Sequence, residues 1–223
     1  MYRILIGGDF FPSTNNYQHF INSDINYLLG EEICALFHNV DYSICNLEGV
    51  FSDYNIPIKK IGPNIRFTPS VINAYAKLNI DCLATANNHI TDYGQKGYED
   101  TVQTLNDNGI DYFGSSLSKN KLKKYINLET GNKSVCIYNV AETMFNTNQE
   151  TQVCVNLYDE YVVLNELKKL KQKYDFLIVL YHGGTENFRY PTPELKKRFH
   201  RMADNGADIV IAQHTHCIGC EEN

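Results

Sequence analysis

Polar residues of metal-ligating types follow five predicted strands of this chain. They are Asp9, then Asn46 and Glu48, then Asn87, Asn88 and His89, then His182, and finally His214 with His216. Carboxylates, carboxamides and imidazoles together suit divalent transition ions such as manganese, iron or zinc. Four of the seven histidines stand just after strands, where a side chain is least useful for packing. The pattern therefore predicts a site for divalent metal.

Each position also has an ordinary structural interpretation. An aspartate after two glycines, as at Asp9, is typical of a turn. The Asn87–His89 segment could form a loop and a helix cap. A His-x-His pair by itself is a moderate signal for metal, because alternate residues on an extended segment can point the same way. The joint occurrence of these groups at strand ends is what favours chemistry. His19, His38 and His200 lie in or near helical stretches, and we expect surface or core roles for them.

The elements that must position these groups are short apolar strands alternating with helices. We expect strands over 3–7, 42–45, 81–85, 175–181 and 208–212, and helices over 31–38, 70–78, 95–108 and 160–173 and from 193 onward. The runs 124–130 and 133–140 flank Gly131-Asn132, which is typical of a two-residue hairpin turn. This order predicts an α/β fold with a mixed sheet. Ligands of such sheets bind at the carboxyl ends of the strands, so the five groups should converge on one crevice.

Composition and charge exclude several classes of protein. The chain has 223 residues, of which 43% are apolar, so it can bury a substantial core and is not a disordered chain. Its net charge of -6 leaves no basic footprint for nucleic acid, because the basic run 168–173 lies on an amphipathic helix. The apolar run 176–181 is too short to cross a bilayer, and the first nine residues lack a signal peptide. We therefore expect no membrane segment and a cytoplasmic location. The chain has seven cysteines, an odd number, and most lie in apolar or strand-like surroundings, which indicates a reducing compartment.

The residues named so far occur in motifs that resemble those of a known family. Gly8-Asp9, Asn46-Leu-Glu-Gly49, and the segments 86–94, 182–186 and 206–216 match the bacterial capsule synthesis protein CapA family of the poly-gamma-glutamate type, which is related to the calcineurin-like metallophosphoesterases. The motifs keep the order of the family over nearly the whole chain, and Asn-Asn-His-x-x-Asp-Tyr-Gly is highly specific. The resemblance implies one domain over residues 1–223, a metallophosphatase-like layered sandwich of mixed β-sheet flanked by helices. Because the family continues past the final His-x-His, we expect the native protein to extend beyond Asn223.

The resemblance also implies roles for individual residues. The implied metal ligands are Asp9, Glu48, Asn88, His182, His214 and His216. Glu48 takes the metal-bridging position, which is normally aspartate in the phosphoesterases. His89 matches a histidine that protonates the leaving group, and Asp92 would orient its ring. Two residues depart from the phosphoesterase pattern: Phe11 replaces a histidine two residues after the first aspartate, and Gln213 replaces a glycine.

The resemblance, taken with the predicted metal site, implies two functions of different classes. The first is a metal-dependent hydrolase of capsule or poly-gamma-glutamate biosynthesis, which acts on a phosphoester or on a glutamyl amide in an anionic polymer. The second is a non-catalytic protein that binds the polymer or partners in its assembly and export, with a structural metal. A plain α/β binding domain is a third alternative. The candidate substrate contacts are Asn46, Asn87, Arg66, Glu186 and Arg189, although either arginine could be an ordinary surface residue.

Overall fold

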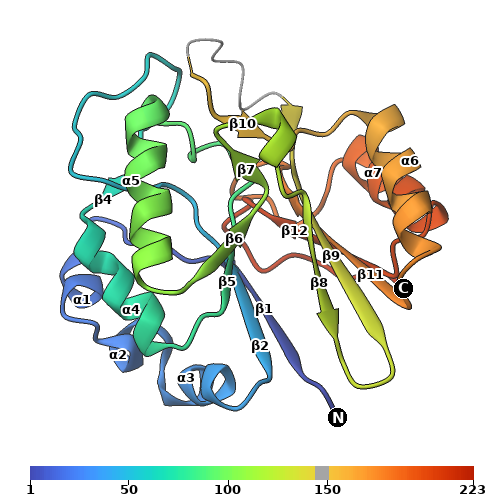
Figure 1. Cartoon of the computed structure of the whole chain (residues 1–223), viewed down its shortest axis with the longest axis horizontal. Helices are drawn as coiled ribbons and strands as arrows, with labels where there is room; N and C mark the ends of the chain where they lie inside the picture. The colour runs from blue at the N-terminus through green and yellow to red at the C-terminus, as the bar shows by residue number, and fades with distance from the viewer. Residues whose placement is uncertain (144–150) are drawn as a thin grey trace.

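Two four-stranded β-sheets form the centre of the protein (Figure 1). The computed structural model describes residues 1–143 and 151–223. The first sheet, in the order β1-β2-β5-β6, consists of β1 (Ile4–Asp9), β2 (Tyr42–Asn46), β5 (Cys82–Ala84) and β6 (Asp111–Phe113). The second, in the order β12-β11-β9-β8, consists of β12 (Ile209–Gln213), β11 (Phe176–His182), β9 (Ser134–Ala141) and β8 (Tyr125–Glu129). Two short pairs complete the strands: β3 (Val50–Phe51) with β4 (Arg66–Phe67), and β7 (Ser115–Ser116) with β10 (Cys154–Val155).

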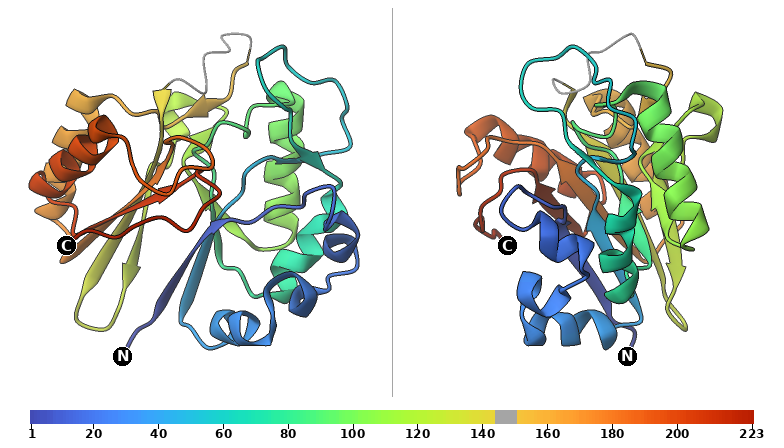
Figure 2. Two further views of the ribbon diagram at one scale, coloured as in Figure 1. Left: turned by 180° about the vertical axis from the view of Figure 1, so that it is seen from behind. Right: turned by 90° about the vertical axis from the view of Figure 1, so that its left-hand side faces the viewer.

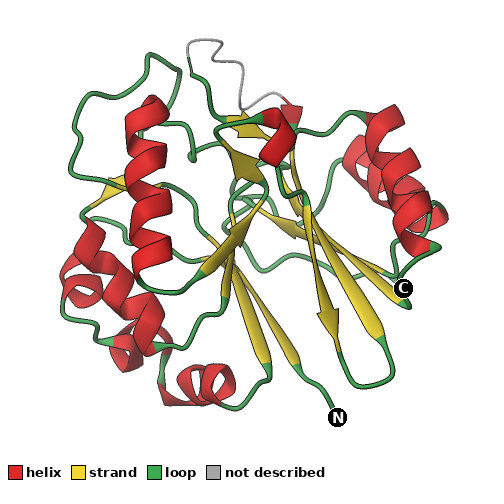
Figure 3. Cartoon of the chain, viewed as in Figure 1, coloured by secondary structure: helices red, strands yellow, loops and turns green. Residues whose placement is uncertain are grey.

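Helices cover the outer face of each sheet, so that the protein has four layers (Figures 2 and 3). Those beside the first sheet are α1 (Tyr17–Ile21), α2 (Ile25–Leu29), α3 (Glu31–His38), α4 (Ile72–Lys77) and α5 (Gly94–Asp107). Those beside the second are α6 (Glu160–Lys171) and α7 (Pro193–Asp204). In the part of the chain that the structure describes, no helix is long and apolar enough to cross a lipid bilayer.

The core alternates along each central strand because successive side chains point to opposite faces of a sheet. In β2, Cys45 packs toward the helices, whereas Ile44 packs toward the other sheet. In β11, Val179 packs toward the helices, and Leu180 packs between the sheets. Strands buried on both faces are apolar throughout, which explains why their sequences show continuous apolar runs.

The strand directions bring the carboxyl ends of both sheets together. All pairs of the first sheet are parallel, and so are β9–β11 and β11–β12. At the edge where these strands end, the Gln213 amide donates to the carbonyl of Gly7 at 3.1 Å, and the Asn46 amide lies 3.2 Å from Nδ1 of His182. Both contacts join the first sheet to the second. The strand-end residues of the two sheets therefore share one polar edge.

The α/β class and the layered sandwich are confirmed, with differences in detail. The strands divide between two sheets, which the sequence did not indicate because a strand buried on both faces is apolar in either arrangement. The expected hairpin is present, since β8 and β9 are antiparallel. The expected helix start at Ser70 is wrong: a 3₁₀ turn over Pro69–Val71 comes first, and α4 follows it. The short strands β3, β4, β6, β7 and β10 were not expected, because two or three residues carry no readable periodicity.

Candidate metal centre

Glu48 lies at the centre of the polar edge, just after β2. Its side chain is fully buried, and neither carboxylate oxygen has a hydrogen-bond partner among residues 1–143 and 151–223. Nε2 of His89, Nε2 of His182 and Nδ1 of His214 lie 3.7, 3.8 and 3.8 Å from Oε1. Nε2 of His216 lies 3.9 Å from Oε2. A buried carboxylate without hydrogen bonds is costly unless a cation compensates its charge.

A glycine allows the chain to place Glu48 there. Gly49 has a φ of +137°, which side chains rarely adopt. A Cβ at this position would lie 2.5 Å from Cζ of Phe67 and 2.8 Å from Cγ2 of Ile65. The backbone therefore turns away from Glu48 directly against β4, and only glycine fits in that turn.

Asp9 is held by two hydrogen bonds at the end of β1. The Asn46 amide donates to Oδ1 at 2.7 Å, and the backbone N–H of His214 donates to Oδ2 at 2.8 Å. Burial, and then the negative charge of Glu48, raise the pKa of Asp9 to about 6. Asn87 donates in turn to Oδ1 of Asn46 at 3.2 Å. The structure thus gives Asn46 and Asn87 a scaffolding position beneath the centre, within the cluster but fully buried.

His182 and Asn88 face each other across the centre. Nε2 of His182 lies 2.8 Å from Oδ1 of Asn88, and the Asn46 amide fixes the other ring nitrogen. Burial, followed by the neighbouring rings of His214, His89 and His216, holds the pKa of His182 well below its usual value, so its ring is neutral. Neutral imidazole is the form that binds metal. Their 2.8 Å separation is a hydrogen bond, and two ligands with metal bonds of about 2.0–2.2 Å lie roughly 3–3.5 Å apart, so these two side chains would separate slightly to hold an ion.

His214 and His216 converge on Glu48 by an unexpected backbone path. Strand β12 ends at Gln213, and the two histidines have φ values of +91° and +52°. The two side chains therefore converge without the extended backbone on which alternate residues point the same way. Non-glycine residues in this region cost about 1–3 kcal/mol each and concentrate at functional sites. Their ligand atoms and those of Glu48 lie within 4.8 Å of one another, as a metal ion would require.

The two sides of the Glu48 carboxylate differ in ligand supply. Oε1 faces His182 and His214, whereas Oε2 faces His216. The Phe11 ring lies 6.1 Å from the His216 ring, on that second side, and offers no ligand atom. The cluster is therefore richer in ligands at Oε1 than at Oε2.

His89 is oriented by residues behind its ring. Its backbone N–H donates to Oδ1 of Asn87 at 3.0 Å, and its Nδ1 lies 2.6 Å from Oδ2 of the fully buried Asp92. Nε2 consequently faces Glu48. The ammonium of Lys60 contacts Oδ1 of Asp92 and lies 3.1 Å from Nδ1 of His89. No sequence pattern pointed to Lys60, because it lies in an irregular stretch about thirty residues before its partners.

The remaining candidates lie at the periphery or elsewhere. Oε1 of Glu186 lies 3.7 Å from Nε2 of His214, on a side chain that is about half exposed. Arg66 donates to the Ser52 carbonyl at 3.1 Å and stacks over the Tyr93 ring. The Nε of Arg189 donates to a backbone carbonyl at 3.2 Å. These contacts give both arginines structural partners, and their assignment to substrate stays a prediction.

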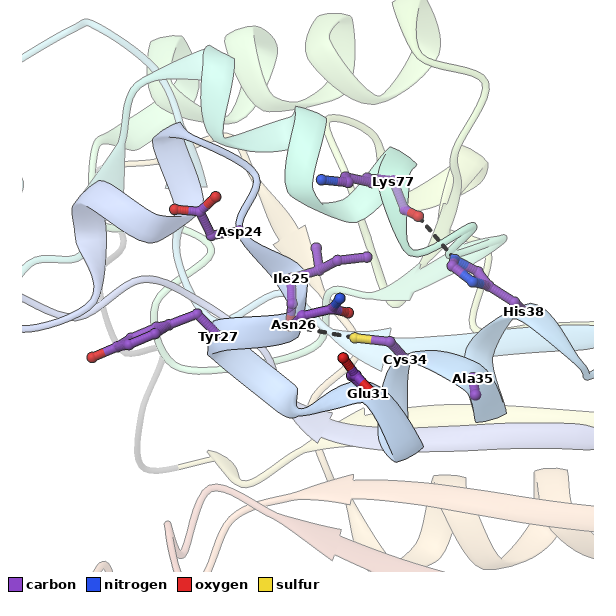
Figure 4. Close-up of a pocket in the computed structure, with 9 residues that line it drawn as sticks. All are labelled: Asp24, Ile25, Asn26, Tyr27, Glu31, Cys34, Ala35, His38 and Lys77. Atoms are coloured by element: carbon purple, nitrogen blue, oxygen red, sulfur yellow. Dashed lines mark hydrogen bonds between the residues drawn. The ribbon is translucent and has the colours of Figure 1, made fainter.

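A hollow of about 630 Å³ lies beside α2 and α3, at the opposite end of β2 from Glu48 (Figure 4). Within it, Nε2 of His38 lies 3.0 Å from the carbonyl of Lys77, and the Cys34 thiol donates to the carbonyl of Ile25 at 3.3 Å. The His38 ring and the Cys34 thiol are thus both hydrogen-bonded to the backbone. Within residues 1–143 and 151–223, no converging ligand set of the kind found around Glu48 lines this hollow.

The pattern of one protein family extends over almost the whole chain. Residues 3–222 match the family described as "Bacterial capsule synthesis protein PGA_cap". The chain is 25% identical over 202 residues to the capsule biosynthesis protein CapA of Bacillus anthracis, a match that covers 82% of this chain and 48% of that protein. It is 24% identical over 190 residues to the PGA biosynthesis protein CapA of Bacillus subtilis (strain 168), covering 82% and 49%. The chain thus spans about half the length of the curated relatives it matches.

The fold also has counterparts among solved structures. A novel phosphatase from Mycoplasma pneumoniae superposes with a TM-score of 0.54 at 18% identity, over 96% of this chain and 64% of that one. At this identity the likeness concerns the fold alone. It agrees with the metallophosphatase-like sandwich expected from the motifs.

Proposed function

Because the chain belongs to the bacterial capsule synthesis protein family PGA_cap, we propose that it is a metal-dependent hydrolase of capsule or poly-gamma-glutamate production. The observation that carries the proposal is the carboxylate of Glu48, which is buried without hydrogen bonds among four imidazoles. Such a group is stabilised by a cation more readily than by anything else within reach. The proposed hydrolytic centre is therefore the edge where the two sheets meet.

The donor set fits a divalent transition ion. One carboxylate oxygen, one carboxamide and two imidazoles surround the richer side, from Glu48, Asn88, His182 and His214. Mixed oxygen and nitrogen ligands of this kind suit manganese, iron or zinc. His216 and Asp9 would serve the other side of the Glu48 carboxylate. A divalent ion held there would supply the Lewis acidity that polarises a phosphoryl or carbonyl group.

The protein itself supplies the proton. Asp92 accepts from Nδ1 of His89, which leaves Nε2 as the nitrogen that faces the centre. A protonated Nε2 can therefore donate to a leaving oxygen or nitrogen beside Glu48, as a general acid. His89 is 5% exposed, so its ring lies inside the protein beside Glu48.

The proposed substrate class rests on the names of the similar proteins. The relatives carry the names capsule biosynthesis protein and PGA biosynthesis protein, and the superposed structure is a phosphatase. A phosphoester and a glutamyl amide of an anionic polymer are the two substrate classes that these names support. In both classes the electrophilic phosphorus or carbon would be polarised by a bound cation, water would form the new bond to it, and the leaving oxygen or nitrogen would take its proton from His89. The chain spans about half the length of each relative, so the activity and partners of the whole relatives do not pass to it directly. Its interaction with other capsule-synthesis proteins is therefore proposed here together with its activity.

Turnover is the test of this proposal. Metal-free protein would be loaded with Mn²⁺, Fe²⁺ or Zn²⁺ and assayed on p-nitrophenyl phosphoesters and on poly-gamma-glutamate. We expect hydrolysis of one class by the wild type, and none by the double variant His214→Ala, His216→Ala, which should also lose bound metal. A matched control is His200→Ala, on the exposed face of α7. No turnover by any metal-loaded form, or equal turnover by the double variant, would refute the hydrolase.

One observation favours a second candidate. Phe11 lies beside His216 and leaves the Oε2 side of Glu48 poorer in ligands, which weakens two-metal chemistry there. A non-catalytic protein would use the same crevice to bind the polymer around a structural ion. Metal-dependent binding of poly-gamma-glutamate without hydrolysis would support this role instead.

A further inference from the structure

The segment between β3 and β4 crosses beside the candidate centre and carries Lys60 (the blue-green loop in Figure 1). We propose that Lys60 is a positioning residue: it holds Asp92, and through Asp92 it holds both the ring of His89 and the segment itself. The role at His89 rests on the proposed function, whereas the hold on the segment does not. Nothing in the motifs or in the family match assigns a role to this lysine.

Asp92 has partners on two sides at once. Its Oδ1 accepts from the ammonium of Lys60, and its Oδ2 accepts from the backbone N–H of Ile65 at 2.6 Å and lies 2.6 Å from Nδ1 of His89. The backbone carbonyl of Asp92 also accepts from the N–H of Ile58 at 2.9 Å. One fully buried aspartate therefore ties three points of the segment to the histidine.

Lys60 lies on the side of His89 away from the ligands. Nε2 of His89 faces Glu48, whereas Lys60 lies 3.1 Å from Nδ1. The ammonium therefore does not face the reacting atoms and acts only through Asp92 and the ring. Its side chain is 17% exposed, so its ion pair with Asp92 is shielded from water. Loss of one partner from a shielded ion pair is strongly destabilising, because the remaining charge is left buried without compensation.

The neighbouring lysine provides a matched control. Lys59 is exposed and makes none of these contacts. Lys59→Met therefore changes the net charge and the composition by the same amounts as Lys60→Met, without touching Asp92. In Lys60→Met, Oδ1 of Asp92 loses its cation while the Glu48 cluster keeps every ligand. We expect the segment to open more often and the ring of His89 to lose its fixed orientation. Metal content should stay at the wild-type level in both variants.

Hydrogen exchange measures the hold on the segment directly. Peptides that cover residues 58–65 should exchange at least about tenfold faster in Lys60→Met than in Lys59→Met or the wild type, because a charged buried hydrogen bond is lost. Asp92→Asn removes the other partner of the same ion pair and should give a similar increase in the exchange rate. It therefore serves as the second variant if Lys60→Met does not fold. Lys60→Arg keeps the charge and should restore most of the protection.

Kinetics measure the effect on His89. On any substrate that the wild type hydrolyses, Lys60→Met should lower kcat by about 10–100-fold with KM nearly unchanged. Added to Asp92→Asn, it should lower kcat little further, because both act through one carboxylate.

The outcomes separate this inference from the proposed function. Faster exchange over residues 58–65 in Lys60→Met, with no turnover by the wild type, would refute the proposed hydrolase activity but support the positioning of the segment by Lys60. Exchange in Lys60→Met equal to that in Lys59→Met would overturn the inference, whatever the turnover. A loss of metal in Lys60→Met would overturn it as well, since Lys60 would then support the ligands.

Discussion

Replacement of Glu48 by glutamine should make the metal-free protein more stable and the metal-loaded protein less stable. Glu48 is 0% exposed, and no hydrogen bond reaches either oxygen in the described part of the chain. In real proteins the cost of such a buried charge is several kcal/mol. Glutamine removes the charge and leaves polar atoms that cost about 1–3 kcal/mol. The net gain without metal is therefore about 1–3 kcal/mol.

The same substitution should abolish the response to metal. For a domain of this size, each kcal/mol moves the Tm by roughly 2–4 °C, so Glu48→Gln should melt about 2–12 °C above the wild type in chelator. Metal at a hundred times its Kd stabilises the wild type by about 2.7 kcal/mol, or roughly 5–11 °C. Glu48→Gln should gain little of this, because the central ligand charge is missing.

Thermal melts with EDTA and with Mn²⁺ or Zn²⁺ test both signs. Glu186→Gln is the matched control: its carboxylate also lies 3.7 Å from a nitrogen of His214, but its side chain is 54% exposed. That control should match the wild type in both buffers. A Glu48→Gln protein that melts below the wild type in EDTA, or that responds to metal as the wild type does, would refute the reasoning.

Further predictions concern the proposed general acid His89, Asp9 at the end of β1, and the turn at Gly49. His89→Ala should keep its metal and lose about 10²–10⁴-fold in turnover, and Asp92→Asn should lose less; loss of metal from His89→Ala would contradict the general-acid role. The pKa of Asp9 is raised from 3.8 to about 6, so the folded protein binds the extra proton and metal-free stability should fall as pH rises from about 4 to 6. Asp9→Asn should flatten that dependence in urea titrations, and an unchanged slope would show that another group causes it. Gly49→Ala should cost about 1–3 kcal/mol in urea unfolding, because its Cβ would lie 2.5 Å from a phenylalanine ring, whereas Gly8→Ala, with open space around it, should be nearly neutral.

The sequence alone indicated which strand-end residues lie at one edge of the fold. The strands ending at Asp9, Asn46 and His182 were identifiable from their apolar runs, because parallel strands buried on both faces need apolar side chains throughout. Polar residues directly after such strands have one edge of the sheet to occupy. For that reason the cluster around Glu48 could be named before its geometry was known, and the hairpin could be recognised from Gly131-Asn132.

Tertiary structure alone decided how those residues face one another. The division into two sheets depends on which apolar faces pack together, and a strand buried on both sides carries no mark of its partner. The left-handed backbone at His214 and the turn at Gly49 depend on contacts with Asp9 and Phe67, which are distant in sequence. Lys60 reaches Asp92 only because an irregular segment crosses beside His89. Local sequence cannot indicate such contacts, because their stability comes from burial and charge that exist only after the chain has folded.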